Sequence, residues 1–531
     1  MRSLLHQLLA DSAARHPARV AVVDQERWLT YAELDRRSNQ VARQLISMGV
    51  RRGDRVGLYL DKSMESVVAI YGTLKAGAAY VPLDPDAPPA RLGGIARDAA
   101  LRVLLTGTEK QATWHELTRH GASLESLVAL NHVKKGLTPP PGVRVVGVEE
   151  IDRRPDEPTE VEMIHLDLAY ILYTSGSTGL PKGVKLSHLN ALTFVEWGVE
   201  TFGLTPGDRL SSHAPLHFDL SVFDLFAAAG AGAAVVLVPR EAVVFPIEAA
   251  RFIESNDITV WYSVPSALTA LALRGNLKDG GGRLSTVRTV LFAGEVFPTK
   301  YLRQMMQLVP HARFFNLYGP TETNVCTFYE VPPLPEGENE PIPIGRAIAN
   351  VEVFAVKDDR SAAGVGEVGE LYVRGSTVMK GYWGDPERTS RVLVSNPLDD
   401  ELPDPTYRTG DLVRLEHDGD YRFLGRRDAQ IKSRGYRIEL GEIETVIYAH
   451  PAVMECAVVA IPDEVVTNRL RAYVVVGEGV TEREIVEVCS RRLPRYMIPE
   501  HFEFLTSLPK TSTGKIDRQS LRSIGVAPVV G

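Results

Sequence analysis

The chain has 531 residues, of which 44% are hydrophobic, 7% aromatic and 24% charged. These values lie close to the average of globular proteins and exclude wholesale disorder, collagen-like repeats and a disulfide scaffold. Lys and Arg total 59 against 67 Asp and Glu, which gives a net charge of −8. Because the chain lacks the basic excess that nucleic-acid binding uses, we expect no nucleic-acid partner.

The three cysteines, Cys326, Cys456 and Cys489, follow no CxxC spacing and have no histidine partner in the sequence. They indicate neither disulfides nor a zinc site, so we expect a cytoplasmic protein. The longest apolar run, residues 225–238, contains two glycines and falls short of the roughly 20 residues that span a bilayer. We therefore predict no membrane span and no membrane partner.

In chain order, short apolar runs alternate with helical patterns from the N-terminus onward. Strands are predicted at 20–23, 55–60 and 79–81, and helices at 31–48 and 64–76. This order is typical of an α/β protein with mixed or parallel sheets flanked by helices. We expect a large N-terminal domain made of several such subdomains.

The pattern changes near residue 415. A predicted hairpin at 412–424 leads into strands at 453–461, 470–476 and 502–504 and a helix at 482–492. We predict a large core of residues 1–427 and a small, mobile α+β domain of residues 428–531. One continuous fold, with a charged loop crossing its surface, is the open alternative.

The most informative segment is 169–184, where an apolar strand runs into a loop of small hydroxyl and glycine residues and then Lys182. Glycine permits positive φ, and successive backbone N–H groups with hydroxyls form a concavity for phosphate oxygens. The segment predicts polyphosphate binding. It is not a Walker A loop, because Lys182 follows Pro181 rather than glycine. Taken alone, a flexible turn is an equal alternative.

Further motifs follow in a fixed order along the chain. They are His217-Phe218-Asp219-Leu220-Ser221, Asn316-Leu317-Tyr318-Gly319-Pro320-Thr321-Glu322-Thr323, the segment 369–375, Tyr407-Arg408-Thr409-Gly410-Asp411, Gly425-Arg426-Arg427-Asp428, the segment 435–442 and Gly514-Lys515-Ile516-Asp517-Arg518. The ordered set resembles the adenylate-forming enzymes, the superfamily of acyl-CoA synthetases, luciferases and adenylation domains of nonribosomal peptide synthetases, over essentially the full chain.

The resemblance implies that ATP and a carboxylate react to an acyl-adenylate and pyrophosphate, with Mg²⁺ bound. Catalysis then rests on positioning and on cations rather than on a protein nucleophile. The residues implied at the β/γ-phosphates are Thr174, Ser175, Gly176, Ser177, Thr178, Gly179 and Lys182. Asn316 and Tyr318 are implied at the adenine, with Gly294, Leu317 and Gly319 in the same site. Asp411 with Arg426 is implied at the ribose, and Thr321 with Glu322, the metal ligand, at the α-phosphate.

The resemblance also implies roles for two residues of the small domain. Lys515 is expected to be the catalytic lysine between the substrate carboxylate and the α-phosphate, assisted by Lys182, Thr321 and Glu322. Asp428 resembles the hinge about which the small domain rotates after adenylation, bringing the segment around Gly435 to the thiol. Asp411 has a plainer interpretation as a turn residue after Gly410.

Asp219 decides the class of acid within the superfamily. A carboxylate beside the site of the substrate carboxylate can pair with an α-ammonium group, so Asp219 indicates an α-amino acid. The alternative is that Asp219 caps a helix that begins at Leu220 or Ser221.

By the same resemblance, ten residues surround the amino-acid side chain, in addition to Phe218. The set is apolar apart from the charged residues Asp219 and Lys515 and the hydroxyl of Tyr262. Bulky residues narrow the pocket, so a small apolar side chain should fit. It resembles the set of stand-alone family members that activate L-proline for a carrier protein. Another small apolar amino acid remains an alternative, because an apolar pocket distinguishes only weakly between side chains that differ by one methylene group. The ten are Asp219, Leu220, Phe223, Tyr262, Leu291, Ala293, Leu317, Val325, Cys326 and Lys515.

Only residues 519–531 follow Arg518, which are too few for a carrier domain. We therefore expect a separate peptidyl carrier protein, whose phosphopantetheine thiol accepts the amino acid. Arg491, Arg492 and Arg495 are candidate contacts to an acidic carrier, although a solvated helix end is the plainer interpretation. Transfer of an acyl or aryl group to free coenzyme A, and a catalytically silent scaffold, are the competing functions.

Overall fold

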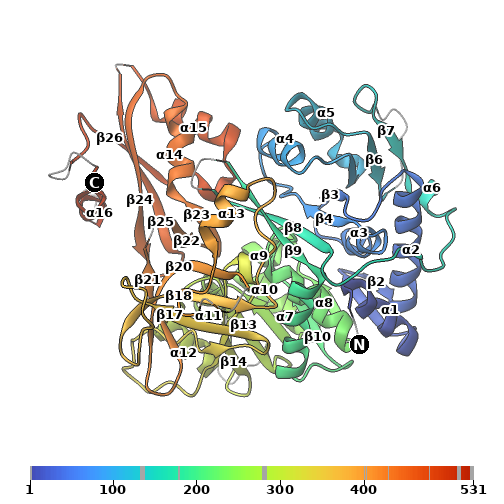
Figure 1. The fold of residues 1–531 in the computed structure, drawn as a ribbon, viewed down its shortest axis with the longest axis horizontal. Coiled ribbons are helices and arrows are strands. Elements are labelled where there is room, and N and C mark those ends of the chain that lie inside the picture. The colour runs from blue at the N-terminus through green and yellow to red at the C-terminus, as the bar shows by residue number, and fades with distance from the viewer. Residues whose placement is uncertain are drawn as a thin grey trace.

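The computed structural model describes residues 3–131, 138–176, 180–277, 284–399, 401, 404–427, 430–477, 479–510 and 516–526. Its main elements form two large sheets with helices between and outside them, followed by smaller sheets toward the C-terminus (Figure 1). The predicted α/β class, with a large N-terminal part and a small α+β part, is confirmed.

The larger sheet has nine strands. Its central strands are parallel, while both ends carry antiparallel pairs. In spatial order the strands are β16 (Arg346–Ala347), β15 (Thr327–Glu330), β14 (Arg313–Tyr318), β13 (Thr289–Ala293), β12 (Val260–Ser263), β10 (Arg209–Ser212), β11 (Ala234–Leu237), β1 (Val20–Asp24) and β2 (Arg27–Thr30).

The second large sheet has seven strands and is parallel except for its last pair. The strands predicted at 20–23, 55–60 and 79–81 are all present within these two sheets. In spatial order the seven are β7 (Arg144–Val146), β6 (Ser126–Ala129), β5 (Val103–Thr106), β3 (Arg55–Tyr59), β4 (Ala79–Pro82), β8 (Leu168–Thr174) and β9 (Lys182–Ser187).

Helices form three layers around these sheets. The layer between the sheets shares one continuous apolar core and contains α1 (Leu5–Arg15), α2 (Tyr31–Ser47), α3 (Met64–Lys75), α7 (His188–Thr201) and α8 (Leu220–Ala231). A second core lies under α9 (Arg240–Val244), α10 (Pro246–Ser255), α11 (Pro265–Arg274) and α12 (Thr299–Leu308). A third lies under α4 (Pro89–Asp98) and α5 (Gln111–Arg119), and α6 (Val148–Ile151) follows β7.

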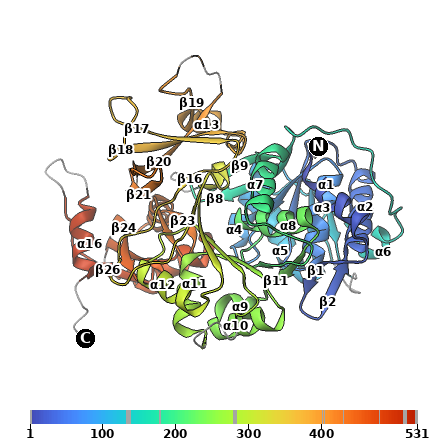
Figure 2. The same ribbon diagram turned by 90° about the horizontal axis from the view of Figure 1, so that it is seen from below.

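We call the described residues up to Arg427 the body. A five-stranded sheet lies at the edge of the body (Figure 2). The predicted hairpin at 412–424 forms its last two long strands. The sheet contains β17 (Val351–Val356), β18 (Val368–Gly375), β20 (Thr406–Leu415), β19 (Leu393–Val394) and β21 (Tyr421–Arg426), with α13 (Pro386–Val392) before β19.

The described residues 430–526 form what we call the C-terminal lobe, orange to red in Figure 1. It has two apolar clusters of its own, and its β25-α15-β26 unit is a parallel crossover as the sequence predicts. Its elements are β22 (Gln430–Ser433), β23 (Tyr436–Glu439), α14 (Leu440–Tyr448), β24 (Val453–Asp463), β25 (Thr467–Val476), α15 (Glu482–Arg492), η3 (Arg495–Met497), β26 (His501–Phe504) and α16 (Arg518–Val526).

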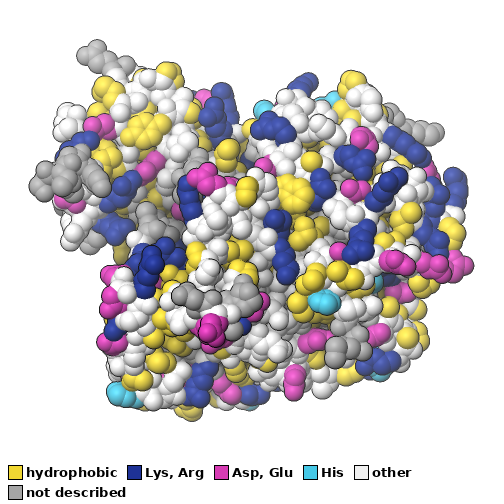
Figure 3. Space-filling model, in the orientation of Figure 1, with side chains coloured by type: hydrophobic (Ala, Val, Ile, Leu, Met, Phe, Trp, Pro, Cys, Tyr) yellow, Lys and Arg dark blue, Asp and Glu magenta, His cyan; other side chains and the backbone are white. Residues whose placement is uncertain are grey.

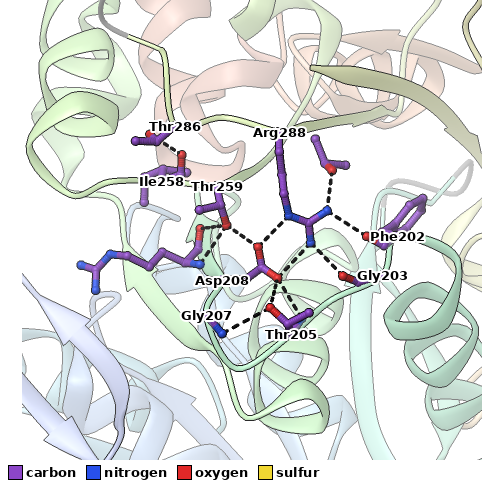
Figure 4. A network of polar contacts seen from close by, with 11 residues as sticks. Phe202, Gly203, Thr205, Gly207, Asp208, Ile258, Thr259, Thr286 and Arg288 are labelled. Atoms are coloured by element: carbon purple, nitrogen blue, oxygen red, sulfur yellow. Dashed lines mark hydrogen bonds and ion pairs between the residues drawn. The ribbon is translucent and has the colours of Figure 1, made fainter. Parts of the chain in front are cut away.

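A buried polar network closes the amino-terminal edge of the nine-stranded sheet (Figure 4). Asp208 precedes β10 and accepts two hydrogen bonds from Arg288, at 2.8 and 2.9 Å, and one from Thr259 at 2.7 Å. Arg288 also donates to the carbonyl oxygens of Phe202 and Gly203. This edge is therefore filled by its own side chains, which leaves the carboxyl edge for ligands, as is typical of α/β sheets.

In the part of the chain that the structure describes, no helix has the length and apolar character needed to cross a membrane.

Candidate functional site

Two adjoining cavities lie at the carboxyl ends of the central strands. The larger, of about 370 Å³, is lined by the last three residues of β14, Asn316 to Tyr318. The smaller, of about 100 Å³, is lined by Asp219, Tyr262 and Thr321. One elongated ligand can extend across both, because they share five lining residues, Gly294, Asp411, Arg426, Gln430 and Lys432.

Glu322 lies at one end of this site, in the turn of 3₁₀ helix η2 (Thr321–Thr323) after β14, and it is fully buried. Its Oε1 accepts a hydrogen bond from the Tyr382 hydroxyl at 2.7 Å and lies 3.2 Å from Lys182 Nζ, while Oε2 lies 2.5 Å from Arg437 Nη1. Burial disfavours its charge, but Arg437 and Lys182 outweigh burial and hold the pKa of this carboxyl well below its usual range. Glu322 is therefore an ionised carboxylate between two cations.

The predicted phosphate loop begins at the end of β8. The Thr174 hydroxyl is buried and has no hydrogen-bond partner among the described residues. Ser175 Oγ donates to the Arg437 carbonyl oxygen at 2.7 Å, and the Gly176 N–H donates to Glu442 Oε2 at 3.1 Å. Thr174 and Ser175 line the smaller cavity, and phosphate binding by the loop stays a prediction. Ser177, Thr178 and Gly179 lie outside the described residues.

Asp411 lies at the junction of the two cavities. It is buried within β20, so it is a strand residue rather than a turn residue. Its two oxygens accept hydrogen bonds from the Tyr318 hydroxyl and from Arg426. The neighbouring Asn316 side chain donates to the Pro343 carbonyl oxygen at 2.7 Å. Arg426 thereby supports Asp411, which the resemblance implies.

Two predicted glycines of the site have steric reasons to be glycine. A Cβ on Gly319 would come within 1.7 Å of the Asn324 carbonyl oxygen, and Gly294 has a φ of +97°. Both positions permit close approach of backbone segments beside the cavities.

Asp219 lies close to the turn that carries Glu322, since Thr321 bonds its carboxyl and the charge of Glu322 acts on it. It immediately precedes α8, with φ and ψ of −62° and −27° and no N-cap hydrogen bond, but its carboxyl also receives the Leu220 N–H and so contacts the start of the helix. Burial raises the pKa of its carboxyl, against a hydrogen bond from Thr321 and the charge of Lys432. Within the described residues no cation lies within ion-pair distance of Asp219. Among the described residues, its carboxyl therefore lacks a counterion.

The predicted side-chain pocket is gathered around Asp219 in two tiers. Lining the smaller cavity are Phe218, Asp219, Leu220, Tyr262, Ala293 and Val325, whereas Leu317 lines the larger one. Phe223, Leu291 and Cys326 are fully buried behind this lining. The Phe223 ring meets the Tyr262 ring edge-on at 5.7 Å, and Leu291 is the strand neighbour of Tyr262. The wall around Asp219 is thus mostly apolar, although Thr174, Thr321 and Lys432 also line this cavity.

Comparisons with known proteins bear on this geometry. Residues 9–383 match the family of AMP-binding enzymes, and residues 442–515 match the AMP-binding enzyme C-terminal domain. The chain belongs to the AMP-binding enzyme family. Because the first match covers more than half of the chain, the resemblance seen in the motifs is confirmed.

Relatives and solved structures agree with this membership. The chain is 41% identical to an L-proline--[L-prolyl-carrier protein] ligase of Pseudomonas fluorescens, over 98% of each chain. It is 39% identical to a ligase of the same name from Streptomyces coelicolor, over 97% of this chain and 95% of that one. The amide bond synthetase McbA of Marinactinospora thermotolerans superposes with a TM-score of 0.86 at 25% identity, over 98% and 99% of the two chains. This AMP-binding enzyme is an AMP-forming ligase, a class that uses ATP.

Two predicted residues of this AMP-binding enzyme, Lys515 and Asp428, lie outside the described residues. Lys510 and Ile516, which flank the segment that holds Lys515, form a bridge with each other, and Lys510 pairs with Glu455 at 2.7 Å. Neither flanking residue lines the two cavities. The lobe instead presents its β22–β23 hairpin to the site.

Sequence reasoning missed three side chains of the site. Arg437 stands in a quoted motif, but no role was predicted for it. Lys432 lines both cavities from β22. Tyr382, which bonds Glu322 and lies 3.1 Å from Lys182 Nζ, had no sequence signal at all, because 60 residues separate it from Glu322. The motif that begins at Gly435 was the available signal for the hairpin.

The residues at Glu322 are suited to a metal held together with a nucleotide. Among the described residues no cluster of three His, Cys, Asp or Glu side chains surrounds a common point. Mg²⁺ needs no such cage, since one carboxylate together with substrate phosphates is a usual arrangement. Glu322 and the hydroxyl of Thr321 fit that role once Arg437 no longer occupies the carboxylate.

Proposed function

We propose that this ligase activates L-proline as prolyl-AMP, with release of pyrophosphate, and transfers it to the phosphopantetheine thiol of a separate peptidyl carrier protein, in secondary-metabolite biosynthesis. The observation that carries the proposal is Asp219, which lines the smaller cavity beside apolar residues and has no ion-pair partner among the described residues. The α-ammonium group of an amino acid would form an ion pair with this carboxylate. The names of the two proline ligases that match over nearly the whole chain support the choice of proline.

In the first half-reaction Asp219 holds the α-ammonium group, and Tyr262 with the residues behind it encloses the pyrrolidine ring. Asp411 accepts hydrogen bonds from the ribose hydroxyls, because a carboxylate can accept two of them. The loop from Thr174 and Lys182 hold the β/γ-phosphates. The proline carboxylate then attacks the α-phosphorus, and Lys515 neutralises the charge that accumulates between the two groups.

Magnesium binding is part of the proposal. Glu322 would hold the ion, with the Thr321 hydroxyl beside it. The ion would offset the negative charge on the departing pyrophosphate.

In the second half-reaction the C-terminal lobe turns about Asp428. We propose residues 1–427 as the body and 428–531 as the mobile unit. In the described arrangement Gly435 lies at the site, where its N–H donates to Glu295 Oε1 at 2.7 Å. The segment expected at the thiol is therefore next to the cavity, which supports assigning this arrangement to transfer.

A surface groove of about 920 Å³ separates α4 from α15 and is the candidate docking face for the carrier protein. Figure 3 shows the surface hollowed between the lobe and the N-terminal body. Arg491, Arg492 and Arg495 line the groove. Their charges suit an acidic carrier helix and support the predicted contacts. A cytoplasmic location stays a prediction.

An amino-acid panel in the ATP–pyrophosphate exchange assay tests the proposal. Proline should give the strongest exchange, and Lys515→Ala should nearly abolish it while the circular dichroism spectrum is unchanged. Exchange with valine or an aryl acid but not with proline would overturn the substrate. Efficient transfer to free coenzyme A rather than to a carrier would favour the acyl-CoA ligase alternative.

A further inference from the structure

The lobe reaches the phosphate loop through one buried carboxylate. Glu442 lies in the first turn of α14 and is fully buried. It forms an ion pair with Arg91 of α4, and its Oε2 accepts the Gly176 N–H at 3.1 Å. A lobe carboxylate thus bonds a backbone donor of the loop that is expected to bind phosphate.

The lobe also reaches the carboxylate that would hold magnesium. Arg437 Nη1 lies 2.5 Å from Glu322 Oε2, and Ser175 Oγ donates to the Arg437 carbonyl oxygen. Arg437 and Glu442 come from one hairpin and the helix that follows it, so they arrive together. All their partners named here, Glu322, Ser175, Gly176 and Arg91, belong to the body.

The charges of these two lobe residues match the charges that the site would otherwise hold. A carboxylate lies where a loop donates hydrogen bonds, and a guanidinium lies on an acidic side chain. We propose that Glu442 and Arg437 are positioning residues that take the places of a pyrophosphate oxygen and of magnesium after both have left. This inference rests on the proposed function.

A consequence is that Mg·pyrophosphate and the docked lobe compete for one site. The two states exclude each other, because each requires the Gly176 N–H and the Glu322 carboxylate. Transfer then begins only on an emptied site. The thiol sulfur forms a bond to the prolyl carbonyl carbon, the bond from that carbon to the AMP oxygen breaks, AMP leaves, and the thiol proton passes to water.

The test measures the dissociation constant of Mg·pyrophosphate by titration calorimetry on the full chain. We call the contacts of Glu442 and Arg437 with the body the latch. Glu442→Gln and Arg91→Gln should each bind Mg·pyrophosphate about tenfold more tightly, because each weakens the latch that competes with this ligand. The two substitutions change the local charge in opposite directions. Simple charge attraction would therefore move the two affinities apart, whereas the latch moves them together.

Glu444→Gln is the matched control. Glu444 lies on the same helix but pairs with Arg518 inside the lobe, at 2.7 Å, so its loss should leave the affinity unchanged. Opposite shifts for Glu442→Gln and Arg91→Gln, or no shift for either, overturn the inference. If one of the two variants does not fold, as judged by circular dichroism, the other variant decides. Arg91→Gln must bind Mg·pyrophosphate more tightly than the wild type does, and Glu442→Gln must bind it more tightly than Glu444→Gln does.

Failure of the proposed function has a different signature. A wild-type protein that exchanges pyrophosphate with proline, but whose variants bind Mg·pyrophosphate as the wild type does, overturns only the latch. Absence of proline-dependent exchange overturns the proposed function itself, and the latch with it.

Discussion

The nine-stranded sheet has a buried carboxylate paired with a guanidinium at each of its two edges, and the two pairs differ in what they join. Asp208 and Arg288 both belong to the body, and each has further hydrogen-bond partners there. Glu322 and Arg437 join the body to the C-terminal lobe. The same chemistry therefore joins segments of the body at the amino-terminal edge and joins the body to the lobe at the carboxyl edge. The second contact would break if the lobe turns as proposed.

At the amino-terminal edge the expected effect is on stability. Asp208→Asn weakens the acceptor of Arg288 and Thr259, and because the Arg288 side chain is 38% exposed and stays hydrated, the free energy of unfolding should fall by about 2 kcal/mol. Urea denaturation measures this, with Asp359→Asn on an exposed loop as the control. Pyrophosphate exchange per folded molecule should stay unchanged. A variant that keeps its stability but loses exchange would contradict the division between the two edges.

The Asp208 contribution should also depend on pH. Burial opposes its charge, but the hydrogen bonds from Arg288 and its neighbours outweigh burial and lower the pKa of Asp208 to about 2. Because the folded state binds the proton less tightly than the unfolded chain, this stabilisation is complete above the ordinary pKa of 3.8 and is lost as pH falls toward about 2. Asp208→Asn should remove that part of the acid dependence.

At the carboxyl edge the main effect should be on catalysis. Glu322→Gln keeps the acceptor for Tyr382 but removes the charge that we assign to the metal, so exchange should fall about 100- to 1,000-fold. Initial rates of proline-dependent exchange measure it. Exchange within threefold of the wild type would mean that the carboxylate serves docking of the lobe alone.

The sequence predicts the parts of the site that lie on the body more completely than those on the lobe. Thr174, Asp219, Glu322 and Asp411 stand in ordered motifs, and the structure gathers all four around two adjoining cavities. Strands and helices followed from hydrophobic periodicity, and α15 matches its predicted range of 482–492.

Contacts between distant segments were beyond the reach of such patterns. Glu442 is 266 residues from Gly176, and Arg437 is 115 residues from Glu322. Local spacing carries no information on which buried charges meet after two units dock. The second tier of the pocket was also hidden, because a residue that lines a cavity and one that lies behind it, such as Leu291, are equally apolar.

Asp219 offers a sharper contrast with Glu322, since no cation in the described part of the chain pairs with it. Asp219→Asn should reduce exchange with proline by about 10- to 100-fold, the value of a charge-assisted contact. An analogue with oxygen in place of the ring nitrogen should be affected far less. Equal losses for proline and the analogue would refute the assigned role.

Asp219 should also respond to pH in the sense opposite to Asp208. Because burial raises its pKa, the folded protein binds the proton more tightly than the unfolded chain. Stability from this group is present at acid pH and falls as pH rises from 3.8 through the raised pKa. At neutral pH, Asp219→Asn should therefore unfold at the same or a higher urea concentration than the wild type. A midpoint shifted downward, as expected for Asp208→Asn, would contradict the difference between the carboxylates.

The smallest expected effect concerns the cysteines, of which Cys326 lies behind the pocket wall and Cys456 and Cys489 lie in the C-terminal lobe. Cys326, Cys456 and Cys489 are free and buried. Burial raises the pKa of Cys326 to about 12 and that of Cys489 to about 12, so very little reactive thiolate exists near neutral pH. Iodoacetamide should leave the native protein unmodified and its exchange unchanged, whereas denatured protein should take up three labels. Selective labelling of Cys326 in the native state, with loss of proline exchange, would show that the apolar wall of the pocket opens to solvent and that Asp219 is not held in a closed site.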